Sequence, residues 1–214
     1  MHIITKKVRL IPAPFVGTRI KIRVSEEDAD RGFGIRIAKI AEGSSDATVD
    51  WGDGVVETLV PKESHEYGQA GTYDIRLSDD ISEIAISISA SGSLIYTSTA
   101  PKVLEFMSNA TKLNRLSGYC FNHCINLERL CCPNIASMSS SVFKDCSRLS
   151  GRLDFPALEE VSGTESTLPF VNCTAIDEIH FAEANEGKLM TCDVFKKVQE
   201  HHLGAVNAVI KFDL

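Results

Sequence analysis

The sequence lacks several features that would place it in a functional class at once. It has no run approaching the roughly 18–20 apolar residues that a membrane-spanning helix needs. The first residues, MHIITKKVRLIPAPF, lack the apolar core of roughly 7–15 residues that a secretory signal carries. The net charge is −7, so the molecule as a whole is not expected to coat a phosphate backbone. We therefore expect neither membrane insertion nor a nucleic-acid partner, and the cellular compartment stays open.

Motifs of common catalytic sites are also missing. The sequence has no G-x-S-x-G, no H-E-x-x-H and no glycine-rich loop that would cradle a phosphate. Serines are frequent in SMSSS (137–141), but no matching histidine and aspartate pattern accompanies them. We therefore predict that the protein is not an enzyme and uses no cofactor.

The composition is that of an ordinary globular protein. The 214 residues suffice for one large domain or two small ones, and 43% of them are apolar and 24% charged. The seven cysteines are an odd number in a chain too long to need disulfide staples, which favours reduced thiols. Residues 1–40 hold nine Lys and Arg against four Asp and Glu, and a basic strand at a sheet edge is the simplest explanation.

The first half of the chain alternates as β-strands do. In TRIKIRV, Ile20, Ile22 and Val24 share one face and basic residues occupy the other. Alternation with a period of two indicates strands with one buried face. The pattern returns in TYDIRL (72–77) and EIAISIS (83–89). Turn-forming residues separate these segments at DWGDG, GQAG and SGS, so we expect an antiparallel β-sandwich.

Two segments of this half resemble a known family. ATVDWGDGVVETL (47–59) is followed by HEYGQAGTYDIRL (65–77). This order resembles the polycystic-kidney-disease (PKD) domain, in which a strand ending in W-G-D-G precedes an H-x-Y segment and a strand containing G-x-Y. The resemblance covers roughly residues 15–98 and implies an Ig/PKD-like β-sandwich.

Physical reasons can be given for the residues of this motif. They are Asp50, Trp51, Gly52, Asp53, Gly54, His65 and Tyr67. The glycines supply backbone angles that other residues avoid, and the aspartates can accept hydrogen bonds from turn amides. Trp51 offers a large apolar body at a sheet end, and we expect His65 and Tyr67 to pack beside it.

Calcium binding and catalysis are two other uses that the acidic residues could have. Asp50, Asp53, Asp79 and Asp80 could bind calcium, although their spacing does not match a dedicated calcium loop. Catalysis by Asp53 and His65 would need a nucleophile or a third partner that the sequence does not indicate. We therefore favour a structural turn.

The second half contains an internal repeat. The frame F-x-x-C-x-x-L/I occurs at FNHCINL, FKDCSRL and FVNCTAI. Its positions are Phe121, Cys124, Leu127, Phe143, Cys146, Leu149, Phe170, Cys173 and Ile176. The cysteines are 22 and 27 residues apart, and the longer step contains one extra residue near Gly151 and four in GTESTL. An abbreviated leading copy keeps the same spacing at Met107, Ala110, Leu113 and Leu116.

A cysteine that recurs in one frame is a metal ligand, half of a disulfide or a small buried hydrophobe. The leading copy has Ala110 at the cysteine position, and Cys132 stands where later repeats have Phe155 and Phe181. Alanine or phenylalanine cannot replace a ligand, but each can replace a group that fills a core, as free cysteine does. Zinc ligands must also converge, whereas stacked repeats spread equivalent positions along an axis. We therefore interpret the cysteines as core residues and expect no metal.

The frame L-x-x-L-x-C/F-P together with F-x-x-C-x-x-L resembles the BspA-type leucine-rich repeat of bacterial surface proteins and of some phage-encoded ones. The resemblance runs from about Lys102 to Phe181. It implies a short solenoid of three full or near-full coils and one abbreviated coil.

The tail is expected to cap the open end of such an array. TCDVFKKVQEHHLG (191–204) is typical of a helix with Thr191 as its N-cap. A final strand is predicted from the alternation of Val206, Ala208, Ile210 and Phe212. The predicted fold is thus mainly β with some α, with a sandwich over residues 1–98, repeats over 99–182 and a capping helix and strand over 183–214.

The resemblance also implies a binding face, because the x positions of L-x-x-L-x-L in leucine-rich solenoids point away from the core. The residues predicted to bind a ligand there are Arg115, Arg129, Arg152, Asp154, Glu178 and His180. A row of arginines beside mixed polar groups suits a protein or carbohydrate ligand, although ordinary solvated strand residues would look the same. We therefore predict a non-catalytic binding or adhesion module, which the resemblance assigns to a bacterial surface. A structural component of a phage or prophage particle and an intracellular scaffold are the alternatives.

Overall fold

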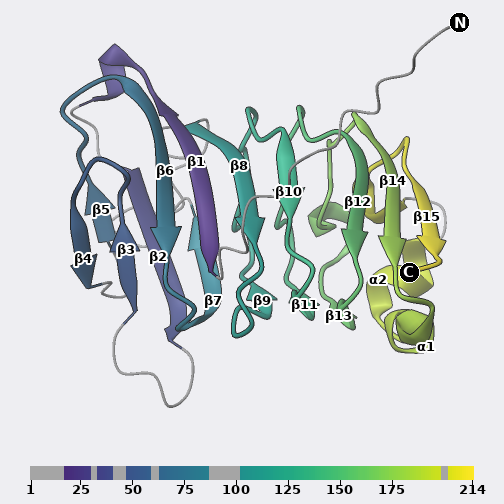
Figure 1. The fold of residues 1–214 in the computed structure, drawn as a ribbon. Coiled ribbons are helices and arrows are strands. Elements are labelled where there is room, and N and C mark those ends of the chain that lie inside the picture. Colours follow the sequence, from purple (N-terminus) through teal and green to yellow (C-terminus); the bar gives the residue numbers. More distant parts are fainter. Residues whose placement is uncertain (1–16, 30–32, 41–46, 59–62, 87–101, 199–201) are drawn as a thin grey trace, which may run out of the picture.

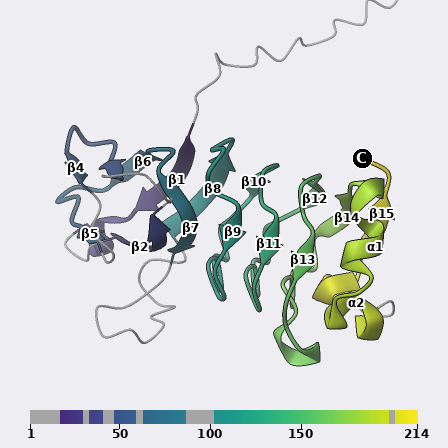
Figure 2. The ribbon, with the colours of Figure 1, turned by 90° about the horizontal axis from the view of Figure 1, so that it is seen from below.

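The computed structural model describes residues 17–29, 33–40, 47–58, 63–86, 102–198 and 202–214. The chain is mainly β with a few short helices, as the sequence predicted. The strands lie in two layers that face each other along the length of the molecule, and the helices lie at the C-terminal end (Figures 1 and 2). Buried apolar residues of both halves of the chain form one continuous core.

Three sheets account for the strands. The first contains, in spatial order, β10 (Arg129–Cys131), β8 (Val103–Ser108), β1 (Thr18–Val24), β6 (Gly71–Leu77), β3 (Thr48–Asp50) and β4 (Val56–Thr58). The second contains β13 (Glu160–Val161), β11 (Ser137–Met138), β9 (Arg115–Leu116), β7 (Ile81–Ile86), β2 (Phe33–Ile40) and β5 (Glu63–His65). The third contains β12 (Gly151–Phe155), β14 (Ile176–Phe181) and β15 (Val209–Phe212), and it continues the layer of the first sheet (Figure 1).

The two halves of the chain share both of the larger sheets. In one layer β1 pairs with β8 in antiparallel fashion, and in the other β7 pairs with β9 in parallel fashion. The two halves therefore meet through backbone hydrogen bonds in both layers, and not through a small contact between separate domains. The predicted boundary at residue 98 lies in 87–101, outside the described residues.

The alternation predicted for the first strand is present, since its three apolar residues are buried. The strand does not lie at a sheet edge, however, because β1 has β6 on one side and β8 on the other. Its basic residues face acids on these neighbours, with Arg19 2.7 Å from Asp74 and Lys21 3.8 Å from Glu105. The prediction of a basic edge strand is therefore wrong.

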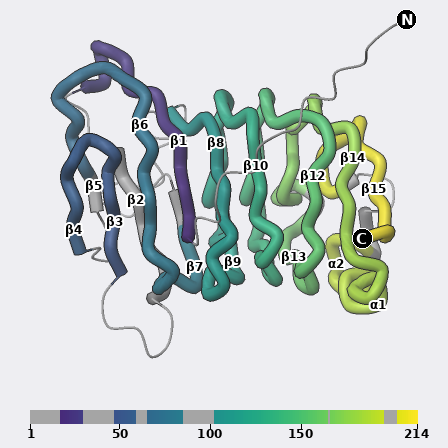
Figure 3. The backbone as a smooth tube through the Cα atoms, viewed as in Figure 1, coloured from purple at the N-terminus to yellow at the C-terminus, as the bar shows by residue number. Residues whose placement is uncertain are grey.

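From β8 onward the chain winds in coils. One coil comprises a strand in the first layer, a strand in the second layer and the turns that join them, as in β8–β9, β10–β11 and β12–β13 (Figure 3). Successive coils pair in parallel: β8 with β10 in one layer, and β9 with β11 and β11 with β13 in the other. The repeated sequence frame thus falls at equivalent places in successive coils.

All nine residues of the repeat frame are buried. The phenylalanines form a column, in which the ring centroids of Phe121 and Phe143 and those of Phe143 and Phe170 are each 5.2 Å apart. These rings are nearly parallel, with interplanar angles of 6° and 7°. Phe106 of β8 packs edge-on against Phe121 at 4.7 Å, so the column begins at the strand that joins the two halves.

The repeat cysteines link one coil to the next. The Cys146 thiol donates a hydrogen bond of 3.1 Å to the carbonyl of Phe121, and the Cys173 thiol donates one of 2.8 Å to the carbonyl of Phe143. Burial raises the pKa of the Cys124 and Cys146 thiols, so these groups stay protonated. All seven cysteines are free thiols. The thiols therefore fill the core and add a second hydrogen bond to carbonyls that already accept one from the N–H of Cys124 or Cys146.

A polar residue with positive φ precedes each repeat cysteine. His123, Asp145 and Asn172 have φ values of 59°, 62° and 64°. These three residue types adopt such angles more readily than most others. Their side chains also contact each other from coil to coil, with His123 Nδ1 3.0 Å from Asp145 and Asn172 Nδ2 donating to Asp145 at 2.6 Å. A polar ladder thus follows the edge of the coils.

The C-terminal helix is shorter than predicted. The structure has α1 (Glu186–Leu189) and α2 (Asp193–Val198), and residues 199–201 lie outside the described part of the chain. Thr191 is not the N-cap, because its hydroxyl donates a hydrogen bond of 2.6 Å to the carbonyl of Lys188 at the end of α1.

The final strand is also shorter than predicted. Val206 is exposed, and β15 begins at Val209. Phe195 of α2 nevertheless packs against the last coil, 5.8 Å from Phe181 and 6.3 Å from Phe212 between ring centroids. The tail therefore packs against the last coil of the core.

We predict that Cys146→Ala lowers the free energy of unfolding by about 1–3 kcal/mol, because it opens a small cavity and removes one of the two hydrogen bonds that the Phe121 carbonyl accepts. Chemical denaturation followed by circular dichroism measures this change. Cys131→Ala is the matched control, since Cys131 is exposed, and its effect should stay within about 0.5 kcal/mol. Equal effects of the two substitutions would contradict a packing role for Cys146.

Candidate functional site

Five of the six residues predicted to bind a ligand lie in neighbouring strands of one layer; His180 is buried there, and the other four are accessible. The five are Arg129 of β10, Arg152 and Asp154 of β12, and Glu178 and His180 of β14. Between them the alternate residues Leu130, Leu153 and Ile179 turn toward the core. We call the outward side of β8, β10, β12, β14 and β15 the strand face.

Arg115 does not belong to the strand face. It lies in β9, in the second layer, where its register partners are Glu83 and Ser137. The leading copy of the repeat correctly identifies core positions, but it does not show which layer a strand belongs to. In that coil the strand of the first layer is β8, and Arg115 follows it in the chain, in β9 of the second layer. Glu105 of β8 is the register partner of Arg129 and so holds the position predicted for Arg115. The prediction of a single row containing Arg115 is therefore wrong.

The first part of the strand face carries charges that alternate in sign. Glu105 lies 3.8 Å from Lys21 of β1 and 3.6 Å from Arg129 of β10. Arg129 is well exposed, with 58% of its side chain accessible, so solvent weakens this ion pair. Much of the arginine therefore remains accessible to a partner.

Arg152 makes its closest contact within its own strand. Its Nε donates to Asp154 at 2.6 Å, and this hydrogen bond raises the pKa of the guanidinium. Both side chains are about half exposed. Arg152 lies in β12, one coil beyond Arg129 in β10.

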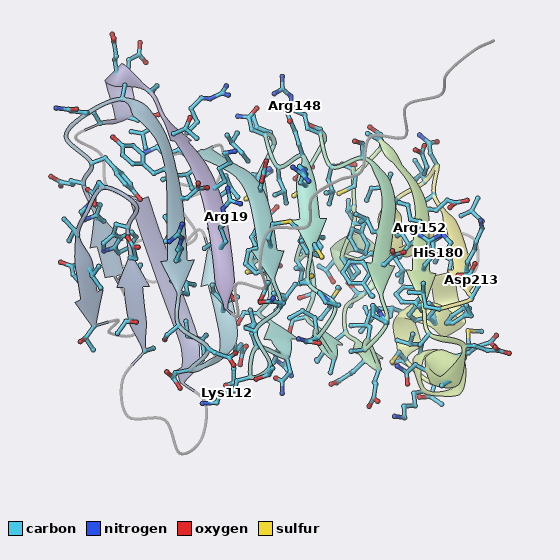
Figure 4. The ribbon with its side chains drawn as sticks, in the orientation of Figure 1. Arg19, Lys112, Arg148, Arg152, His180 and Asp213 are labelled. Atoms are coloured by element: carbon cyan, nitrogen blue, oxygen red, sulfur yellow. The ribbon has the colours of Figure 1, made fainter. Side chains whose placement is uncertain are left out.

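His180 is at the centre of a charged cluster at the C-terminal end of the face (Figure 4). Its side chain is 1% exposed, with Nε2 2.9 Å from Glu178 and Nδ1 2.5 Å from Asp213. A carboxylate therefore faces each nitrogen of the ring. Lys211 of β15 donates to Glu178 at 2.5 Å.

The contacts of Glu178 change its acidity. The hydrogen bond from Lys211, and after it the one from His180, lower the pKa of Glu178 to about 2. The carboxylate is therefore charged throughout the physiological range. It ties β14 to β15 across the face.

Both ring nitrogens of His180 have a carboxylate partner. A general base needs a nitrogen that is open toward a substrate, and here a carboxylate faces each nitrogen of His180. Throughout the described ranges, no three His, Cys, Asp or Glu side chains come together in a way that could hold a metal ion. What the face does present is a set of charged groups at fixed spacing on a strand ladder.

The motif around Trp51 forms a compact cluster at the other end of the molecule. Trp51 is fully buried and stacks on His65, with ring centroids 4.9 Å apart. The Tyr67 hydroxyl donates to the carbonyl of Trp51 at 3.1 Å, and Asp53 lies 2.6 Å from His65. At Gly52, with φ of +83°, a Cβ atom would lie 2.7 Å from the carbonyl oxygen of Asp74, so only glycine fits.

The four aspartates weighed as calcium ligands have other partners. Asp50 and Asp53 accept hydrogen bonds from the N–H groups of Gly52 and Val55 within the turn. Asp79 accepts one from Thr111, and Asp80 lies 2.8 Å from Lys112. These contacts hold the two pairs of aspartates in different turns.

Sequence reasoning missed Glu105, Lys211 and Asp213 on the strand face. The signal for Lys211 and Asp213 was present, because both alternate with the apolar residues of the final strand. Glu105 could not be recognised, since only the pairing of β8 with β10 places it beside Arg129. The polar ladder also had a signal, namely His, Asp or Asn directly before each repeat cysteine.

We predict that Glu178 makes stability sensitive to acid. Its pKa of about 2 in the folded chain lies below the ordinary value of 4.5, so its contribution is complete above pH 4.5 and is lost as the pH falls toward 2. The difference in unfolding free energy between the natural chain and Glu178→Gln should therefore be constant above about pH 5 and should shrink below it. Denaturation at a series of pH values measures this, and a difference that stays constant down to pH 2 would contradict the proposed contacts.

Comparison with known proteins identifies no relative of this chain. No family model matches the chain, and neither a curated protein nor a solved structure matches it significantly. Within the described part of the chain, none of the helices is long and apolar enough to cross a membrane.

Proposed function

We propose that the protein is a non-catalytic binding or adhesion module whose strand face recognises a protein or carbohydrate partner. In this proposal residues 102–181 are a BspA-type leucine-rich-repeat solenoid, and the first part of the chain is a PKD-like β-sandwich. The sequence resemblance to BspA-type repeats favours a bacterial surface as the place of action. Arg129 and Arg152 are the central contacts.

The coil geometry supports the assignment of the repeats. Equivalent residues of the frame stack at equivalent places, and the parallel pairing of β8 with β10 is what a solenoid requires. The W-G-D-G turn beside His65 and Tyr67 likewise supports the PKD-like assignment, because the paired motifs pack against one another.

The observation that carries the functional proposal is the exposure of two arginines on a rigid strand ladder. The side chains of Arg129 and Arg152 are 58% and 49% accessible, although they occupy successive coils of a packed array. An arginine offers five N–H donors in a planar fork, which suits carboxylate and hydroxyl acceptors on a partner. The ladder holds the two forks at a fixed separation, so little conformational entropy is lost when a partner binds.

A second candidate is a structural component of a phage or prophage particle. It is favoured by apolar residues that are exposed on strands at the two ends of the molecule. The genes beside this one would discriminate: tail or baseplate genes would support a particle, and secretion or sortase genes would support a surface protein.

We predict that Arg129→Glu combined with Arg152→Glu reduces affinity for a partner recovered by pull-down by about 100-fold or more, because two contacts become repulsive. Titration calorimetry with the recovered partner measures the change. Arg148→Glu is the matched control. Arg148 is 59% accessible and lies 3.3 Å from Glu128, and Figure 4 shows it away from Arg152, at the edge of the coils. Unchanged affinity of the double variant would move the binding site away from the strand face.

A further inference from the structure

Exposed apolar side chains concentrate at the two ends of the molecule. In the part of the chain that the structure describes, the large exposed ones are Val55, Val56, Ile125, Val206, Val209 and Leu214. Val55 and Val56 belong to the turn and strand of β4, and Val206, Val209 and Leu214 lie in or beside β15. β4 and β15 are at opposite ends of the structure (Figure 1). Single exposed apolar residues are ordinary, but this distribution places five of the six at two strands.

Both strands are also edges of the same layer. Among the described strands, β4 has a hydrogen-bonded neighbour only in β3, and β15 has one only in β14. An edge strand presents unpaired N–H and C=O groups that can template another strand. At the C-terminal end, the edge strand of the other layer, β13, is covered by a helix. α1 lies beside β13, and Lys188 of α1 is 2.6 Å from Glu159.

Charged side chains often protect sheet edges, but here the charges of both edge strands are turned toward their own molecule. Glu57 of β4 accepts a hydrogen bond of 2.7 Å from the indole N–H of Trp51. Lys211 of β15 donates to Glu178 of the neighbouring strand at 2.5 Å. A valine is thus well exposed on each of the two strands, at 65% for Val56 and 52% for Val209.

The directions of the two strands are compatible with pairing. β4, β6 and β8 run the same way, because antiparallel neighbours separate them, and β10 is parallel to β8. The arrows of β12, β14 and β15 point the same way as that of β8 (Figure 1). If a second copy were placed end to end with the first, without rotation, its β4 would therefore run parallel to β15 of the first copy.

The side-chain orientations also agree. Glu57 is the register partner of the buried Val49, so Val56 points to the outer side of the layer. In β15, Ile210 and Phe212 pack against the core, so Val209 points to the outer side as well. A register that places Val56 beside Val209 also places Thr58 beside Lys211, and no like charges meet.

We propose that the chain associates with further copies of itself, head to tail, by adding β15 of one copy to β4 of the next as a parallel strand pair. The two surfaces are different, so the contact is heterologous and extends into an open chain of molecules unless rotation closes it. This self-association is independent of the ligand proposed for the strand face. It would align successive strand faces into one longer surface.

Concentration decides whether the assembly is seen. The pairing strands have three and four residues, so the interface is small and the association weak. Sedimentation equilibrium on the full chain, at concentrations up to on the order of 1 mM, measures the average mass against the monomer mass of 23.4 kDa. We expect the mass of the natural chain to rise beyond that of a dimer as the concentration increases.

Two substitutions test the head-to-tail arrangement. Val56→Lys blocks the β4 edge and Val209→Lys blocks the β15 edge, so each variant alone should remain a monomer. An equal mixture should form dimers and nothing larger, because the open β15 of the first variant meets the open β4 of the second. Ile125→Lys replaces an exposed apolar residue away from both edges and should associate like the natural chain. Circular dichroism verifies that each variant is folded.

Each of the remaining outcomes would overturn the proposal. A natural chain that stays at the monomer mass up to on the order of 1 mM has no such interface. Dimers of Val56→Lys alone would indicate that β15 pairs with β15, and dimers of Val209→Lys alone that β4 pairs with β4. A folded mixture that stays monomeric, or a loss of association in Ile125→Lys, would place the contact elsewhere.

Discussion

Backbone hydrogen bonds between β1 and β8 and between β7 and β9 determine the form of the whole molecule. The first half of the chain thus pairs with both strands of the first coil, β8 and β9, whose edges would otherwise be open. For this reason the coils need no separate N-terminal cap. Phe106 of β8 is the first ring of the aromatic column. The outward charges also continue from one half to the other, from Lys21 through Glu105 to Arg129.

The interior of the coils explains why the strand face is rigid. Stacked phenylalanines fill the core, and the thiols of Cys146 and Cys173 bind carbonyl groups of the preceding coil. Outside, the ladder of His123, Asp145 and Asn172 repeats the same link between coils with polar groups. A surface held in this way keeps its charged groups at fixed spacing.

Local patterns predicted much of this structure. The alternation of the first strand and the F-x-x-C-x-x-L frame placed residues in the core because burial depends on short-range periodicity. Pairing between distant segments has no such local signal. The sequence therefore put β1 at an edge and Arg115 on the strand face, whereas the pairing of β1 and β10 with β8 decides both. The prediction of Thr191 as an N-cap was wrong because α1 ends just before it, at Leu189, and the Lys188 carbonyl of α1 accepts the hydrogen bond of its hydroxyl.

The central claim is that the two halves, which share both layers, unfold together. Trp51, the only tryptophan, reports on the first half, and all cysteines lie in the second half. Urea unfolding followed both by Trp51 fluorescence and by alkylation of Cys124, Cys146 and Cys173 compares the two directly. The shared sheets predict one transition with a common midpoint. Loss of the Trp51 signal at a urea concentration where the three thiols remain protected would contradict the account.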